Sequence, residues 1–266
     1  MSLYKLGVIG CGNMGGAIVR SIIARKIINP EFVFLNDKDK KKSENLSRET
    51  NCEDKELLSL IQESNTIIIA VKPQDFDPVL KQISENIKNQ TIVSIAAGIR
   101  IKTILDKIGR QIPVVRAMPN MASFELEGMT CISFNERVKN ADEIKNIFFG
   151  IGEVQEIDES LMDSITALSG SGPAYLFYLA EAMIEAGCAL GLEEFMVRRL
   201  VTQTLYGSSV FMKNTDFLPE DLIKMVSSKG GTTEAALSVF TENKMKSIIK
   251  TAILKAKQRS EELSGG

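Results

Sequence analysis

The chain has 266 residues, of which 44% are hydrophobic and 25% charged, with a formal net charge of −2. These values are typical of a globular protein of one or two domains, and they exclude an electrostatic basis for binding nucleic acid or an anionic membrane. The sequence contains no histidine, which excludes Ser-His-Asp and Cys-His catalysis and histidine-ligated zinc sites.

Cysteine usage indicates a reducing compartment. The four cysteines have neither metal-type nor paired spacing; they are Cys11, Cys52, Cys131 and Cys188. We therefore expect free thiols, no metal site and a cytoplasmic location. The N-terminal residues have no signal-peptide pattern, and the most apolar predicted helix, 174–192, contains two glutamates, so we expect no membrane span.

In the first part of the chain, short β-rich runs alternate with amphipathic segments. The predicted strands are 3–9, 32–36, 66–71, 91–95, 114–117 and 130–133, with a possible edge strand at 154–157. The predicted helices between them include 14–25, 55–62, 76–87 and 101–107. This alternation predicts a mostly parallel sheet with helices on both faces, a Rossmann-like doubly wound α/β domain over residues 1–157.

From residue 158 to residue 266 the pattern predicts an all-α domain. The expected breaks between its helices are 169–172, 191, 213–217 and 227–231, with Ser171 as an N-cap before Pro173. The helix 173–190 is apolar around much of its circumference. Such a helix needs neighbours on most sides, which favours dimerisation through this domain. The tail 263–266 is expected to fray.

A glycine-rich motif lies between the first predicted strand and the first predicted helix. It reads Gly10-Cys11-Gly12-Asn13-Met14-Gly15. Gly10 permits a tight turn, Gly12 permits close approach of a pyrophosphate, and Gly15 permits close packing of helix on strand. The motif predicts a dinucleotide cofactor bound at the helix N-terminus by Gly10, Gly12, Asn13, Met14 and Gly15. A glycine turn that only joins the two elements is the alternative.

The end of the second predicted strand gives opposing signals about the cofactor. Asn36 can serve NADH or NADPH, whereas Asp37 would repel a 2′-phosphate. Lys38 or Lys40 would attract one, although their basic cluster is interleaved with aspartates and resembles a solvated helix start. We expect NADPH, with NADH as the alternative.

Three further loops follow predicted strands and are expected to form one rim, because ligands bind at the carboxyl ends of such strands. Candidate cofactor contacts in them are Ala70, Val71, Lys72, Pro73, Ala97, Gly98 and Asn120. Lys72 would contact a phosphate or ribose, or point into solvent. The small residues Ala97 and Gly98 would let a flat ring approach the backbone. Asn120 would hold a nicotinamide carboxamide, or be a simple turn residue.

The segment 226–237 places two glycines and four hydroxyl side chains between helical patterns. Backbone amides in such a segment can bind a small anion. The candidate substrate-binding residues are Ser228, Gly230, Gly231, Thr232 and Thr233. The alternative is a helix cap with Thr232 or Thr233 as N-cap; the two interpretations are compatible, since a capped helix N-terminus is itself an anion site.

Five segments, in this order, resemble the pyrroline-5-carboxylate reductase family. They are 9–15, 70–74, 116–120, 167–175 and the Gly-Gly-Thr-Thr run at 230–233. The resemblance implies a Rossmann domain, a helical domain that dimerises by interlocking helices, and dimers that often assemble into rings. It also implies NADPH or NADH as hydride donor, 1-pyrroline-5-carboxylate as substrate and L-proline as product. It places the Thr233 hydroxyl beside the ring nitrogen as catalytic hydrogen-bond partner and proton relay.

The chemistry of the residues agrees with this resemblance. A ring imine is basic enough to be partly protonated in water, so strong general acid catalysis, and hence histidine, is optional. The chain departs from the family at three places: Lys229 stands where proline is common, Met121-Ala122 replaces Thr-Pro, and Asp37 replaces a residue that is often neutral or basic in NADP-using relatives.

Two alternative functions remain. One is a reductase of a related cyclic imine; the other is a catalytically silent dinucleotide-binding paralogue. A β-hydroxyacid dehydrogenase would need a lysine on the long helix, and 175–181 contains none. The expected partners are a cyclic imino acid and a second copy of the chain, with no nucleic acid and no membrane.

Overall fold

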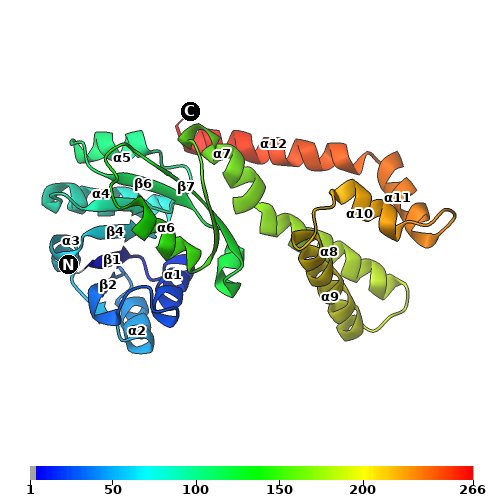
Figure 1. Cartoon of the computed structure of the whole chain (residues 1–266), viewed down its shortest axis with the longest axis horizontal. Coiled ribbons are helices and arrows are strands. Elements are labelled where there is room, and N and C mark those ends of the chain that lie inside the picture. The colour runs from blue at the N-terminus through cyan, green and yellow to red at the C-terminus, as the bar shows by residue number, and fades with distance from the viewer. Residues whose placement is uncertain (1–3, 266) are drawn as a thin grey trace. The chain divides into compact units, whose positions relative to one another are not determined.

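The computed structural model describes residues 4–265, and the structural statements below concern this part of the chain (Figure 1). Leu3 and Gly266, which belong to the first predicted strand and to the predicted frayed tail, lie outside it. The strands are β1 (Leu6–Ile9), β2 (Val33–Asn36), β3 (Glu53–Asp54), β4 (Thr66–Ile69), β5 (Thr91–Ser94), β6 (Val114–Met118), β7 (Gly128–Phe134) and β8 (Gly152–Glu156).

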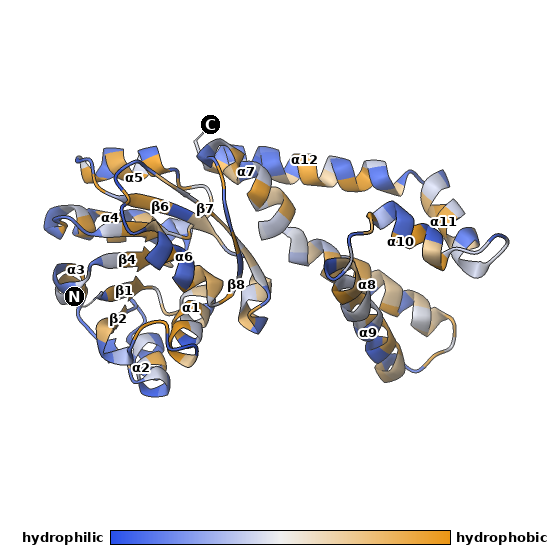
Figure 2. Cartoon of the chain, viewed as in Figure 1, coloured by the Kyte–Doolittle hydropathy of each residue, from blue (hydrophilic) through white to orange (hydrophobic). Residues whose placement is uncertain are grey.

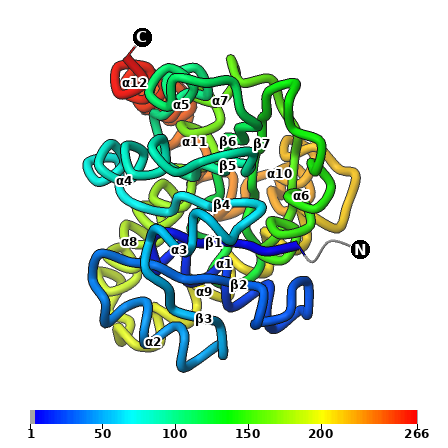
Figure 3. Tube along the Cα trace, turned by 90° about the vertical axis from the view of Figure 1, so that its left-hand side faces the viewer, coloured from blue at the N-terminus to red at the C-terminus, as the bar shows by residue number. Residues whose placement is uncertain are grey.

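All eight strands form one sheet in the order β3-β2-β1-β4-β5-β6-β7-β8, and the tube in Figure 3 shows β4, β5 and β6 running side by side. Every neighbouring pair is parallel except β6 and β7, which are antiparallel. The predicted mostly parallel sheet is therefore confirmed, with β8 at its edge. The strand order reverses at β1, so the carboxyl ends of β1, β2 and β4 meet at a topological switch point.

Helices cover both faces of the sheet because its strands are apolar on both sides. One layer contains α1 (Asn13–Ala24), α2 (Lys40–Thr50) and α6 (Ala141–Phe149); the other contains α3 (Leu57–Glu63), α4 (Pro73–Asn86) and α5 (Ile101–Ile108). Alternate strand residues serve the two cores: Val8 and Ile68 pack with the first layer, Ile67 and Ile69 with the second. The apolar colour of β1 and β4 in Figure 2 follows from this double burial.

The remaining helices are α7 (Met162–Ile165), α8 (Gly172–Ala189), α9 (Glu194–Lys213), α10 (Pro219–Val226), α11 (Thr232–Glu242) and α12 (Met245–Leu263). The chain forms two compact units. The sheet unit comprises the residues up to Ser171 and those from Ala256 onward; the helical unit is Gly172–Lys255.

The predicted N-cap at Ser171 is wrong. Between α7 and α8 the chain makes one π-helical turn, Thr166–Gly170, closed by the Ser171 amide donating to the Thr166 carbonyl at 2.9 Å. Ser171 has φ −85° and ψ −15°, which are helical values, whereas an N-cap residue is extended. The glycines here therefore mark a π-bulge instead of the start of an independent helix.

Within the helical unit, α8 and α9 approach closely and leave apolar side chains exposed. A Cβ on Gly187 would lie 2.5 Å from Val197 Cγ1, so only glycine permits this separation. On α8, Leu176, Phe177 and Tyr178 are 55%, 60% and 75% exposed within the single chain. Large apolar side chains that are exposed on more than one side of a helix are typical of a surface that another protein covers.

The end of α12 is ordered against the sheet unit, so the predicted fraying of Leu263 and Ser264 is wrong. The hydroxyls of Ser260 and Ser264 donate to Asp163 Oδ1 at 2.7 and 3.0 Å. Both serines are buried. A buried carboxylate that needs hydrogen-bond donors explains why Ser260 and Ser264 are held in place.

Among the described residues, no helix combines the length and the apolar character needed to cross a bilayer. The cysteines are free: Cys11, Cys52 and Cys131 are buried and Cys188 is exposed.

Candidate functional site

The three glycines of the loop after β1 meet three different steric requirements. Gly10 has φ +101°, and a Cβ there would lie 2.6 Å from the Ala70 carbonyl oxygen. A Cβ on Gly15 would collide with the Gly10 carbonyl oxygen, so Gly15 lets α1 pack on the loop. Gly12 has no atom within 4 Å of its Cβ position. The backbone at Gly12 is therefore open to a ligand.

Backbone amides of this loop are oriented by the neighbouring strand. Gly10 donates to the Asn36 carbonyl at 2.8 Å, and Cys11 donates to Asp37 Oδ2 at 2.7 Å. Helix α1 begins at Asn13, so the amides of Asn13, Met14 and Gly15 have no acceptor within the helix. Together with the helix dipole, they make the loop a site for an anion.

A pocket of about 550 Å³ opens on this loop at the carboxyl ends of β1, β2 and β4. Its lining includes seven of the residues predicted to bind the cofactor: Gly10, Gly12, Asn36, Asp37, Ala70, Val71 and Lys72. Lys38, which the sequence offered as a partner of a 2′-phosphate, also lines it, as do Lys42, Glu56 and Asp75, which the sequence did not indicate as pocket residues. These residues come from different elements, and only the fold brings them together.

Carboxylates already engage two of the cationic groups after β2. Lys38 Nζ lies 2.5 Å from Asp75 Oδ1, and Lys40 Nζ lies 3.0 Å from Asp54 Oδ2. The side-chain amide of Asn36 donates to the Lys55 backbone carbonyl at 2.7 Å.

The Cys11 thiol in the glycine loop is neutral. Burial, followed by the charges of Asp37 and Asp54, raises the pKa of Cys11 to about 12. It therefore takes no part as a nucleophile at neutral pH.

Four of the predicted rim residues do not line this pocket: Pro73 begins α4, Ala97 and Gly98 follow β5, and Asn120 follows β6. Gly98 has φ +76° and lies against the end of α12, where its Cβ would approach Leu263 to 3.2 Å. Asn120 donates to the Ser169 carbonyl and hydroxyl at 3.4 and 3.3 Å and accepts from the Met129 amide at 3.2 Å. Its side chain thus joins the loop after β6 to β7 and to the π-helical turn.

A buried charged network behind β6 was not foreseen. Arg116 is 2% exposed; its Nη1 lies 3.5 Å from Glu159 Oε1 and its Nη2 3.7 Å from Asp163 Oδ1. Burial lowers the pKa of Arg116, although both carboxylates oppose this. Burial alone would raise the pKa of Asp163, but hydrogen bonds from Ser260 and Ser264 and the charges of Arg116 and Arg100 outweigh it and lower the pKa. A charged residue inside an apolar strand is the signal that could have indicated this network.

In the helical unit, the predicted anion-binding turn is formed, but two of its backbone amides already donate to acceptors of the same segment. Gly230 has φ +72°, and its amide donates to Glu234 Oε2 at 2.5 Å. The Gly231 amide donates to the Ser228 carbonyl at 3.0 Å. Gly231 is the N-cap of α11, with φ −86° and ψ 171°, so the alternative interpretation with Thr232 or Thr233 as N-cap is wrong. Those two threonines begin the helix, and their amides have no acceptor within it.

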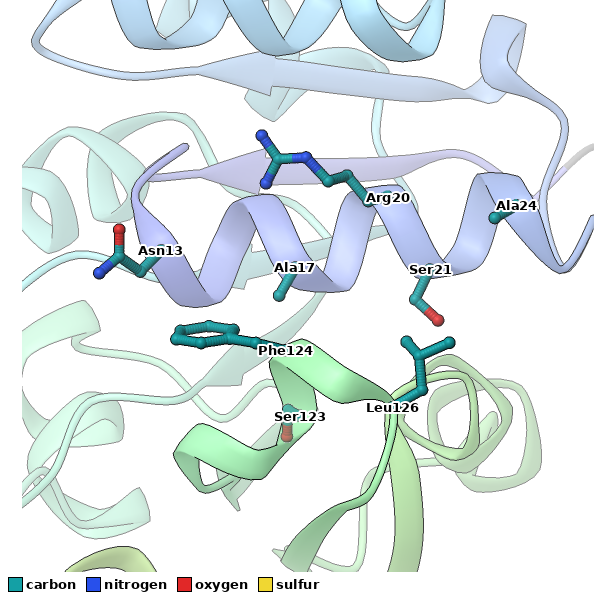
Figure 4. A pocket seen from close by; sticks show the side chains of 8 residues that line it. All are labelled: Asn13, Ala17, Arg20, Ser21, Ala24, Ser123, Phe124 and Leu126. Atoms are coloured by element: carbon teal, nitrogen blue, oxygen red, sulfur yellow. The ribbon is translucent and has the colours of Figure 1, made fainter. Parts of the chain in front are cut away.

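Two other hollows are not lined by Gly10 or Gly12, although Asn13 lines the first of them. One of about 400 Å³ lies between α1 and the short 3₁₀ turn Met121–Glu125, where the Phe124 ring lies along α1 and Ser21 points toward Leu126 (Figure 4). Its one charged lining residue, Arg20, bonds Glu49 at 2.7 and 2.8 Å. The other, of about 1010 Å³, includes Asn65 and Gln90 beside the amino ends of strands. Ligands of such sheets bind at the opposite, carboxyl ends.

Comparisons with known proteins support both halves of this description. Residues 159–263 match the family model for pyrroline-5-carboxylate reductase dimerisation, and residues 5–98 match the model described as NADP oxidoreductase, coenzyme F420-dependent. Pyrroline-5-carboxylate reductase of Staphylococcus haemolyticus is 33% identical over 98% of both chains. Pyrroline-5-carboxylate reductase 2 of Bacillus subtilis is 31% identical over 98% of this chain and 95% of its own.

Solved structures agree. The Plasmodium falciparum pyrroline carboxylate reductase with NADP bound is 30% identical, covers 99% of both chains and has a TM-score of 0.89. The Coxiella burnetii pyrroline-5-carboxylate reductase is 28% identical over 99% of both chains, with a TM-score of 0.91. The chain therefore belongs to the pyrroline-5-carboxylate reductase family.

Proposed function

We propose that the protein is an NAD(P)H-dependent reductase that converts 1-pyrroline-5-carboxylate into L-proline, the last step of proline biosynthesis. The observation that carries this proposal is the similarity to a curated relative, which is 33% identical over 98% of both chains. The aligned region spans both the sheet unit and the helical unit. The glycine loop and the Gly-Gly-Thr-Thr turn, one in each unit, give the proposal its residues.

The sheet unit fits a dinucleotide. The open space at Gly12 and the amides of Asn13 and Met14 suit a pyrophosphate. Pro73 begins α4 and fixes the loop that carries Lys72. When bound, the reduced nicotinamide supplies the hydride. Ala97, Gly98 and Asn120 are the proposed contacts on the nicotinamide side. The hydrogen bonds of Asn120 hold the loop after β6 in place.

The helical unit supplies the proposed substrate residues. The amides of Thr232 and Thr233 at the start of α11 would bind the substrate carboxylate, and Ser228, Gly230 and Gly231 shape the turn that presents them. The Thr233 hydroxyl would hydrogen-bond the ring nitrogen and relay a proton to it. Because protonation makes the imine a better hydride acceptor, orientation of the substrate matters more than a strong acid.

The proposed assembly is a homodimer through the helical unit, with a ring of dimers as its larger form. The match of residues 159–263 to a dimerisation model and the exposed apolar face of α8 support the dimer. The same match supports a division of the chain into 1–157 and 158–266 by function. The free cysteines support a cytoplasmic location, and the net charge of −2 supports the proposed absence of nucleic-acid and anionic-membrane partners.

A direct experiment is to incubate purified protein with racemic pyrroline-5-carboxylate and either reduced cofactor, and to identify proline by mass spectrometry. The proposal expects cofactor oxidation proportional to enzyme and stoichiometric with proline. Absence of proline with both cofactors at high enzyme concentration would refute it. Cofactor binding without turnover would favour a silent paralogue, and faster turnover of a six-membered cyclic imino acid would favour the related imine reductase.

Replacement of Thr233 tests the assignment of roles within the site. Thr233→Ala should lower kcat by about tenfold to a thousandfold and leave dinucleotide binding unchanged, because loss of a proton-transfer contact affects the chemical step. Thr233→Ser keeps the hydroxyl and is the matched control; it should retain most of the activity. Loss of cofactor binding in Thr233→Ala would show that the division of roles between the two motifs is incorrect.

A further inference from the structure

The residue that follows β2 is the one expected to contact the adenosine ribose of a dinucleotide in the pocket of the sheet unit. In doubly wound dinucleotide-binding folds, an acidic residue at this position accepts a hydrogen bond from a 2′-hydroxyl, whereas a nearby arginine accommodates a 2′-phosphate. Here the residue is Asp37, which lines the pocket beside Gly10 and Gly12.

The carboxylate of Asp37 is fixed from two sides. Its Oδ2 accepts from the Cys11 amide at 2.7 Å, and its Oδ1 accepts from the Asp39 amide at 2.8 Å. Because Cys11 belongs to the glycine loop, the negative charge is anchored to the loop that would hold the pyrophosphate. Each carboxylate oxygen has a second lone pair for a ribose hydroxyl, which can donate. A phosphate dianion offers that carboxylate only acceptors and like charge.

The cations next to Asp37 do not form a phosphate clamp. The ammonium nitrogen of Lys38 lies 2.5 Å from a carboxylate oxygen of Asp75, and that of Lys40 lies 3.0 Å from one of Asp54. The Lys38 side chain is 75% exposed, so its ion pair is weak and its ammonium is free to leave. Lys38 is therefore the one neighbour that has to be tested as a rival partner of a 2′-phosphate.

The two other lysines of the pocket are placed differently. Lys42 lies within α2, with its Nζ 4.0 Å from Asp39 Oδ2. Lys72 precedes α4 after β4, and β1 lies between β4 and β2 in the sheet. No arginine lines this pocket among the described residues. The planar, bidentate group that best binds a phosphate is thus missing from it.

We propose that Asp37 makes this chain bind NADH more tightly than NADPH, by accepting a hydrogen bond from the ribose 2′-hydroxyl and repelling a 2′-phosphate. This inference rests on the proposed function, since it presumes that the pocket holds a nicotinamide dinucleotide. Two comparisons name NADP, the family model that matches residues 5–98 and the Plasmodium falciparum structure, but both names describe relatives and neither concerns Asp37 of this chain.

The test measures binding at the adenosine end of the cofactor, independently of catalytic turnover. Calorimetric titration of the full-length protein with 5′-AMP and with 2′,5′-ADP isolates the effect of the 2′-phosphate, and the same titrations follow with NADH and NADPH. We expect at least about a tenfold preference for the ligand without the 2′-phosphate in each pair, the discrimination that a single charged contact commonly provides.

Three variants locate the cause. Asp37→Ser should reduce the preference by about tenfold or reverse it, because it removes the charge and keeps a hydroxyl. Glu44→Ser removes the same charge from α2, outside the pocket lining, and should leave the preference unchanged. Lys38→Ala should not weaken NADPH selectively. Thermal midpoints of all variants verify that each is folded.

The proposal is overturned if wild type binds 2′,5′-ADP or NADPH as tightly as its partner ligand, or if Asp37→Ser leaves the ratio unchanged. Selective loss of NADPH binding in Lys38→Ala would also overturn it, by identifying a 2′-phosphate contact. In those cases the reductase assignment stands. Absence of binding for all four nucleotides would overturn both the inference and the proposed function.

Discussion

Removal of the Asp163 carboxylate should destabilise the sheet unit, because it deprives the buried Arg116 guanidinium of one of its two carboxylate partners. The two side chains are 11% and 3% exposed, so solvent can replace little of the lost interaction. Breaking a buried ion pair costs about 3–5 kcal/mol. The present nitrogen–oxygen distance of 3.7 Å is long, and Glu159 remains 3.5 Å from Arg116. We therefore expect about 3 kcal/mol for Asp163→Ala, the low end of that range.

Two further variants separate the contribution of the Asp163 charge from that of its hydrogen bonds. Asp163→Asn keeps an oxygen that accepts from the hydroxyls of Ser260 and Ser264 but loses the charge. The double variant Ser260→Ala with Ser264→Ala keeps the charge but removes both donors, which lie at 2.7 and 3.0 Å. A net contribution of about 0.5–1.5 kcal/mol for each hydrogen bond assigns about 1–3 kcal/mol of the loss expected for Asp163→Ala to the two serine hydroxyls. Urea unfolding followed by fluorescence or circular dichroism measures each effect. A loss under about 1 kcal/mol for Asp163→Ala would refute the reasoning, since that is the range of exposed pairs.

The same carboxylate gives a pH dependence with a defined sign. The pKa of Asp163 is lowered in the folded protein, so the folded state favours the ionised form. Its contribution is therefore fully present above the unfolded value of about 3.9 and is lost as the pH falls through the lower folded pKa. The stability difference between wild type and Asp163→Asn should be constant near neutral pH and shrink below about pH 4. A difference that grows on acidification would contradict this sign.

Gly10→Ala should abolish dinucleotide binding and destabilise the fold, because φ is +101° and a Cβ would lie 2.6 Å from a backbone oxygen. Gly109→Ala has similar strain at φ +72° but no atom within 4 Å, and calorimetry should show unchanged binding with a loss of only about 1 kcal/mol. Leu176→Glu, at a side chain that is 55% exposed on α8, should yield monomers in light scattering, whereas Leu58→Glu, 50% exposed on α3, should not. Equal oligomeric states for both leucine variants would argue against dimerisation through α8.

Sequence patterns predicted the sheet well because its strands are short β-branched runs buried on both faces. The runs at 66–71 and 91–95 correspond to β4 and β5. β3 was not predicted, because it consists of two acidic residues, Glu53 and Asp54, which have no apolar pattern. Such a strand exists only because the exposed edge of β2 offers hydrogen-bonding partners, and that is a property of the folded sheet.

The candidate site was predictable where the chemistry is local. The glycine loop and the turn at 230–231 depend on backbone conformation that neighbouring residues specify. The bond from the Gly230 amide to Glu234 spans four residues, and a glutamate at that spacing could have indicated it. The contact between Ser260 and Asp163 spans 97 positions and leaves no local pattern. Burial of Arg116 likewise follows from packing between distant elements.

The most direct test of the central claim is isotope transfer. Wild-type protein is incubated with pyrroline-5-carboxylate and reduced cofactor carrying deuterium at the transferable position of the nicotinamide, and the proline formed is examined by mass spectrometry. The account predicts proline heavier by one mass unit, with the deuterium on the carbon that belonged to the imine. Unlabelled proline, or no proline with either labelled cofactor, would contradict it.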